Sequence, residues 1–70
     1  MDQETIKNWF TYHSPGVDDV PKLIAIRQAA LHLALVINDN SPDSADKTAA
    51  IRKVREAVMT ANAAIACGGK

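Results

Sequence analysis

The chain has 70 residues, which allow one domain spanning residues 1–70, and so short a domain buries too little of its surface to be comfortably stable alone. Its eight basic and eight acidic residues balance, which argues against electrostatic capture of long DNA or RNA. One cysteine excludes an internal disulfide, and two widely spaced histidines supply no metal site, so we expect further copies of the chain to stabilise it as a homo-oligomer.

The N-terminal stretch MDQETIKNW is acidic and lacks a hydrophobic run, so we expect no secretory signal. The longest apolar stretch, AALHLALVI, is shorter than the ~20 residues that a bilayer-spanning helix needs. These two features predict a cytosolic protein that has no membrane partner.

A short helix is predicted over about residues 2–10. Asp2 can cap its N-terminus, and Ile6, Trp9 and Phe10 are spaced three and four residues apart on one face. We expect Trp9 and Phe10 to anchor this helix against the rest of the chain or against a neighbouring copy.

Tyr12 and His13 lie in the break that follows, TYHSPGVDD, in which Pro15 and Gly16 predict a turn. A tyrosine ring on such a loop either packs against the protein or projects from it, and the residues alone leave both interpretations open. A projecting ring beside an arginine suits a nucleotide, because stacking of a base on an aromatic ring contributes about 1–3 kcal/mol.

A second helix is predicted over about residues 19–38, with Asp18 or Asp19 as its N-cap. Its apolar residues recur at steps of three and four, which indicates a heptad-like seam on one face. The seam residues are Leu23, Ile26, Ala30, Leu33 and Ile37.

A third helix is predicted over about residues 42–66, with Ser41 as its N-cap and Pro42 in its first helical position. Gly68 and Gly69 suit the end of a helix. This helix repeats the pattern of the second one, with a seam made of Ile51, Val54, Val58, Ala61 and Ile65.

The predicted fold is therefore all-α, a short N-terminal helix followed by an antiparallel hairpin of two long helices. The hairpin leaves apolar residues over, because Ile24, Leu31 and Leu35 form a second stripe on the middle helix. Two stripes need two partners, which again favours assembly of several copies.

Arg27 lies between the two apolar stripes, where an unpaired guanidinium would be costly, so it must find an anion. The partner is either a carboxylate on the same or a neighbouring chain, or a bound phosphate that the planar fork grips bidentately. A second basic group follows on the third helix, where Arg52, Arg55 and Asn62 share one edge. That edge is either a solvated face or a second anion site at a junction between subunits.

Catalysis finds little support in the sequence. Neither histidine is spaced to activate a nucleophile, and neither a glycine-rich phosphate loop nor a set of metal ligands appears. We therefore expect no enzyme, no catalytic residue, no metal and no cofactor.

At FTYHSPG, IRQAALHLALVI, SPDSADKTAAI and REAVMTANAAIA the chain resembles small phage proteins of the anti-CBASS protein 2 family, over about residues 10–66. The hairpin domain of that family is shared with an anti-Thoeris sponge. The resemblance implies a homohexamer in the cytoplasm of the bacterial host. It also implies that the protein binds cyclic di- and trinucleotide messengers such as cGAMP and holds them intact, so that bacterial immune effectors are not activated.

The resemblance also assigns residues. Tyr12 matches the base-stacking tyrosine of a Tyr-His-x-Pro motif that also contains His13, and Arg27 takes the place of a basic residue, often lysine, that meets the phosphates of a cyclic dinucleotide. A separate site for cyclic trinucleotides is expected near Arg52, Arg55 and Asn62.

Two other functions compete with the sponge. A structural helical oligomer or protein-interaction adaptor without a nucleotide ligand predicts that Arg27 pairs with a carboxylate. A nuclease that degrades the messenger is the third hypothesis, and it lacks candidate catalytic groups.

Overall fold

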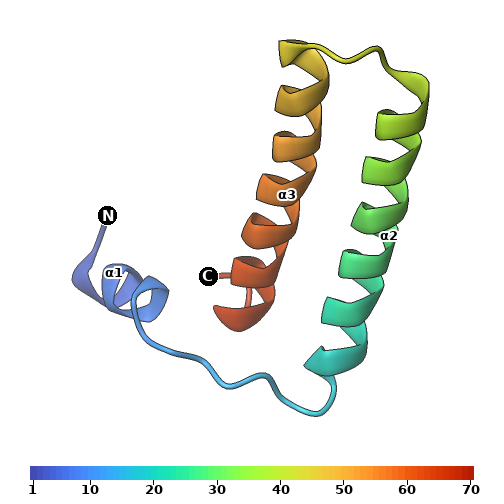
Figure 1. The fold of residues 1–70 in the computed structure, drawn as a ribbon. Coiled ribbons are helices and arrows are strands. Elements are labelled where there is room, and N and C mark those ends of the chain that lie inside the picture. Colours follow the sequence, from blue (N-terminus) through green and yellow to red (C-terminus); the bar gives the residue numbers. More distant parts are fainter.

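A computed structural model of the protein describes residues 1–70, and these form three α-helices without a strand. The helices are α1 (Gln3–Trp9), α2 (Asp19–Asn40) and α3 (Ala45–Ala66). In Figure 1, α2 and α3 run antiparallel side by side, and α1 lies on the opposite side of α3, near its C-terminal end. The predicted all-α fold with a helical hairpin is confirmed.

The predicted cap of α1 is also confirmed, because Asp2 Oδ1 accepts a hydrogen bond of 2.8 Å from the backbone N–H of Thr5. That backbone hydrogen bond is the main reason why the pKa of Asp2 is lowered from its ordinary value. Phe10 is the C-cap of α1 rather than its last helical residue.

α2 begins after Asp18, whose side chain makes no capping hydrogen bond. Asp19 is used instead to close the preceding turn, where its Oδ2 atom accepts a hydrogen bond of 3.1 Å from the backbone N–H of Gly16. The helix continues to Asn40, beyond the expected end at residue 38, since the backbone N–H of Ser41 still donates to the carbonyl of Ile37 at 3.0 Å.

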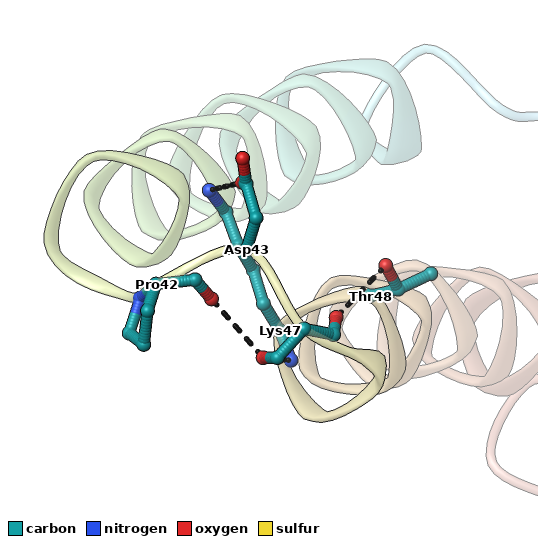
Figure 2. A network of polar contacts seen from close by, with 5 residues as sticks. Pro42, Asp43, Lys47 and Thr48 are labelled. Atoms are coloured by element: carbon teal, nitrogen blue, oxygen red, sulfur yellow. Dashed lines mark hydrogen bonds and ion pairs between the residues drawn. The ribbon is translucent and has the colours of Figure 1, made fainter.

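The N-cap of α3 is Ser44, so the expectation of a cap at Ser41 and a helix from residue 42 is wrong. Ser44 Oγ accepts a hydrogen bond of 3.1 Å from the backbone N–H of Lys47. Ser41 is the C-cap of α2 and has extended backbone, the conformation that a following proline favours. Figure 2 shows the connection from Pro42 onward.

The same connection holds the one ion pair of the chain. Lys47 Nζ lies 2.9 Å from Asp43 Oδ1. The hydrogen bond from Lys47, followed by its charge, lowers the pKa of the fully exposed Asp43 carboxyl from its ordinary value. The pair ties the start of α3 to the turn before it.

α3 ends in a Schellman motif, as the two glycines predict. Gly68 and Gly69 have φ angles of 64° and 79°. The backbone N–H of Gly68 donates to the carbonyl of Ile65 at 3.2 Å, and that of Gly69 donates to Ala64 at 2.9 Å. The chain therefore turns back sharply over the end of α3.

The hairpin packs along two half-buried seams. The seam on α3 consists of the residues predicted from the sequence, whereas on α2 Ala34 replaces Leu33, whose side chain is 49% exposed. The reason is the helical period, because steps of three, four, four and three follow 3.6 residues per turn better than strict alternation does. The half-buried apolar residues of α2 are Leu23, Ile26, Ala30, Ala34 and Ile37.

The single chain covers little of its apolar surface. No residue is buried, and the molecule measures 45 × 29 × 15 Å, about one helix layer thick. Its radius of gyration is 15.1 Å, whereas a compact domain of this length has about 11 Å. The hairpin is therefore an open, flat scaffold that exposes both broad faces.

By length and composition alone, α2 could also cross a membrane, since it has 22 residues and an 18-residue window of mean hydropathy 1.5. This differs from the expectation based on the longest apolar stretch, because the window tolerates the isolated polar residues of α2. Core helices of soluble proteins and signal sequences have the same composition. In this chain α2 packs lengthwise against α3, a helix that carries several charges on its other faces.

Candidate functional site: a basic hollow on the helical hairpin

Arg27 lies on α2 at the edge of a hollow between α2 and α3, with a volume of about 280 Å³. Arg55 of α3 lines the same hollow. Neither arginine forms an ion pair within the chain, since the one ion pair joins Lys47 and Asp43. Two unpaired guanidinium groups from two helices thus share one hollow.

The rest of this hollow is apolar. Leu31 is 60% exposed and Met59 is 61% exposed, and alanine and β-branched residues form the floor. An anion that enters such a site loses water but gains two planar donors, each able to bind a phosphate bidentately. We call the surface formed by Arg27, Leu31, Arg55 and Met59 the basic hollow.

The sequence assigned Arg27 and Arg55 to different ligands, whereas the structure brings them to one hollow. The sequence does not indicate how α2 is rotated about its axis relative to α3. Spacing places Arg27 beside one seam and Arg55 beside the other, but only the packed hairpin decides that both lie on the same broad face.

Arg52 and Asn62 complete the predicted edge of α3. Arg52 is exposed and is not among the residues that line the basic hollow. Asn62 is half-buried, and its Oδ1 atom is covered yet accepts no hydrogen bond within the chain. Covered polar atoms in proteins are almost always hydrogen-bonded, so this oxygen without a partner is an exception within the chain.

Tyr12 lies on the loop between α1 and α2 and is 84% exposed, so in the single chain its ring projects rather than packs. It is not among the residues that line the basic hollow, and the single chain does not bring it together with Arg27 there. His13 is half-buried beside it, and its Nε2 atom lies 2.8 Å from the carbonyl oxygen of Asn8. Because a carbonyl only accepts, His13 Nε2 carries the proton and donates.

A second hollow, of about 600 Å³, separates α1 from the outer face of α3. Trp9 and Phe10 line it from α1 and its C-cap, and Ala63 and Ala64 line it from α3. Phe10 is 86% exposed, so it does not anchor α1 within the single chain, whereas Trp9 does so through its indole nitrogen. The sequence signal for this hollow is the run of small residues near the end of α3.

No group of three His, Cys, Asp or Glu side chains is placed to hold a metal ion. His13 is engaged with a backbone carbonyl, and its neighbour at that carbonyl is the thiol of Cys67, whose Sγ lies 3.9 Å from the same oxygen. The exposed groups that suit a nucleotide include the guanidinium groups of Arg27 and Arg55 and the ring of Tyr12.

The fold and this surface define a small helical-hairpin binding protein whose open face offers unpaired arginines to an anion. The profile of the Acb2/Tad1 hairpin domain matches residues 2–66, and the chain belongs to this family. Membership supports a phage protein of the sponge type that binds cyclic nucleotides, and a binding role rather than an enzymatic one. No curated protein and no solved structure matches the chain.

Proposed function

We propose that this protein is an anti-CBASS sponge that binds cyclic di- and trinucleotide messengers intact, as a homohexamer in the cytoplasm of the bacterial host. With the messenger held, the immune effector is not activated. Family membership supports the general class, and the residues of the hairpin face support the chemistry of the ligand.

The observation that carries the proposal is the basic hollow. Arg27 and Arg55 lack carboxylate partners in the chain and share an apolar surface that is open to solvent. A cyclic oligonucleotide has the matching parts, since its phosphates are anionic and its bases have apolar faces. The adaptor hypothesis predicts that Arg27 pairs with a carboxylate, and since no carboxylate of the same chain does so, that partner would have to come from a neighbouring chain.

The proposed dinucleotide site needs a second copy of the chain. Tyr12, His13 and Arg27 are its assigned residues, and Tyr12 does not line the hollow of its own Arg27. A ring from one copy that meets the arginine of the next would complete the site. The exposed ring of Tyr12, held on a loop instead of in a core, supports such an arrangement.

The proposed trinucleotide site uses Arg52, Arg55 and Asn62 at a junction of several copies. Arg52 and Arg55 are exposed, and their positive charges at this edge support a contact with an anionic ligand. Because Arg55 also lines the basic hollow, the two sites are adjacent or overlapping rather than remote.

Calorimetry with 3',3'-cGAMP and with cyclic tri-adenylate tests the proposal, followed by chromatographic recovery of the ligand. We expect saturable binding and unchanged ligand. Tyr12→Ala should weaken dinucleotide binding about 5- to 150-fold, because it removes the stacking surface for one base. The Tyr12→Ala variant should keep the oligomer mass of the unaltered chain.

The matched control is Val17→Ala, which changes another exposed apolar residue of the same loop and should leave affinity unaltered. Full retention of binding by Tyr12→Ala would move the site elsewhere. Absence of binding to every cyclic oligonucleotide in a broad panel would refute the sponge, and ligand turnover would favour a nuclease.

A structural or adaptor role is favoured by one separate observation, the apolar hollow lined by Trp9 and Phe10. Its walls carry aromatic and small residues and suit a protein surface better than a phosphate. If the purified oligomer binds no nucleotide, this hollow is the place to search for a protein contact.

A further inference from the structure

We propose that the Gly68–Gly69 turn positions the Tyr12 loop, with Asn8 and Trp9 as the positioning residues that connect the two. The sequence predicts the turn only as the end of a helix. In the structure, the turn also holds α1, and α1 holds the loop. The ligand of Tyr12 is taken from the proposed function, whereas the positioning itself is tested without ligand.

The first link runs from α1 to the turn. Asn8 Nδ2 donates to the carbonyl oxygen of Cys67 at 3.3 Å, and Trp9 Nε1 donates to the carbonyl oxygen of Lys70 at 3.1 Å. These two carbonyl groups flank the two glycines. The turn therefore presents one acceptor to each of two neighbouring side chains of α1.

Apolar packing does not replace these hydrogen bonds. The hollow of about 600 Å³ lies between α1 and α3, and the apolar side chains of α1, Ile6 and Trp9, are 41% and 52% exposed. A helix of 7 residues is also too short to be stable in isolation. The position of α1 therefore depends on its polar contacts with the end of α3.

The second link runs from α1 to the loop. Thr11 Oγ1 donates to the carbonyl of Lys7, and His13 Nε2 donates to the carbonyl of Asn8 at 2.8 Å. These contacts tie the residues on both sides of Tyr12 to α1. Tyr12 itself remains exposed between two anchored neighbours, so its ring is free to meet a ligand while its backbone is held.

The geometry of the turn depends on glycine. The φ angle of Gly68 is 64°. Among residues other than glycine, only asparagine and aspartate adopt this left-handed backbone conformation with any frequency. A Cβ atom added at Gly68 meets nothing within 4 Å. A substitution there therefore acts through the backbone angle and not through a clash, which makes Gly68 a clean test position.

The test compares Gly68→Val with Gly68→Asn in the full chain. Asparagine tolerates the left-handed conformation and valine does not. We expect Gly68→Val to weaken binding of 3',3'-cGAMP about tenfold, because the loop must be ordered on binding, and Gly68→Asn to bind within about twofold of the unaltered chain. Equal weakening by both variants would contradict the proposed role of the turn.

Two measurements follow the positioning without any ligand. In Gly68→Val, the indole N–H of Trp9 should exchange with solvent at least about tenfold faster, and ¹⁵N relaxation should report a more mobile Tyr12 amide. Helical circular dichroism should change little, since α2 and α3 pack on each other independently of α1. Trp9→Phe keeps a ring but removes the donor, and should mobilise the Tyr12 amide in the same way.

The outcomes separate the two proposals. A rigid Tyr12 amide in both Gly68→Val and Trp9→Phe would overturn the positioning role whether or not nucleotides bind. A mobile Tyr12 amide with unchanged affinity would overturn the expected tenfold loss of binding, because the order of the loop would then be irrelevant to capture. Failure of the unaltered chain to bind any cyclic oligonucleotide would refute the proposed function, while the relaxation data would still decide the positioning.

Discussion

At the scale of single residues, the hairpin depends on which serine caps α3. Ser41 precedes Pro42 and fits the pattern of an N-cap followed by proline, yet Ser44 makes the capping hydrogen bond to Lys47. Ser44 Oγ also donates to the carbonyl of Pro42 at 3.0 Å (Figure 2). One hydroxyl group thus serves both the turn and the helix that follows it.

Ser44→Ala should lower the free energy of unfolding by about 1 kcal/mol, since an unmade N-cap leaves a backbone N–H without its partner. For a domain of this size that corresponds to a melting temperature lower by about 4–8 °C, measured by circular dichroism at fixed protein concentration. Ser41→Ala is the control, because no hydrogen bond of the Ser41 side chain is lost. Equal effects of the two substitutions would contradict this assignment of the cap.

At the scale of elements, α2 and α3 contribute one guanidinium each to the basic hollow. The two arginines are 28 positions apart in the sequence, and they line one hollow because α2 and α3 run antiparallel side by side (Figure 1). Neither guanidinium has a carboxylate partner in the chain, so a phosphate that contacts them gains charge-assisted hydrogen bonds without breaking an ion pair. A hollow of this kind favours an anionic ligand over a neutral one.

If one cyclic dinucleotide occupies the basic hollow, Arg27→Gln and Arg55→Gln should each weaken its binding by about 10- to 100-fold, as expected for a lost charge-assisted hydrogen bond. The double variant should lose less than the product of the two, because both groups hold one ligand. A calorimetric double-mutant cycle measures this coupling.

Lys53→Gln is the matched control for that cycle. Lys53 lines a different hollow with Ala29 and Ala57, and its removal changes the net charge equally. If Arg55→Gln alters only trinucleotide binding, the two arginines serve separate ligands, as the family resemblance implies.

At the scale of the whole molecule, the single chain exposes more surface than a compact protein of its mass. The chain exposes 5728 Å², whereas a compact protein of its mass exposes about 4,200 Å². The excess of about 1,500 Å² exceeds the ~800 Å² that each partner contributes to an ordinary interface. One chain therefore has surface for contacts with more than one neighbour.

Leu35→Glu should reduce the oligomer mass, because Leu35 belongs to the second apolar stripe and is half-exposed in the single chain. Burial of the new charge at an interface would be unfavourable by several kcal/mol. Sedimentation at micromolar concentration measures the mass. Gln28→Glu adds the same charge at an exposed polar position of α2 and should leave the assembly intact, whereas a monomeric unaltered chain would contradict the expected oligomer.

The sequence by itself determined the features that act within one or two helical turns. These are the all-α class, the cap at Asp2, the glycine turn that ends α3, and the half-buried seam of α3. Such signals are local, because a cap or a positive φ angle concerns hydrogen bonds between near neighbours in the chain.

Only the tertiary structure decided how the helices are rotated and what their ends touch. In the structure, Ala34 and not Leu33 belongs to the seam of α2, and Arg27 and Arg55 line one hollow. The structure also shows that α1 contacts the turn after α3. The physical reason is that rotation about a helix axis depends on the shapes of both packed surfaces, which no single helix contains. In the proposed assembly of several chains, the partner of Tyr12 would depend on packed surfaces for the same reason.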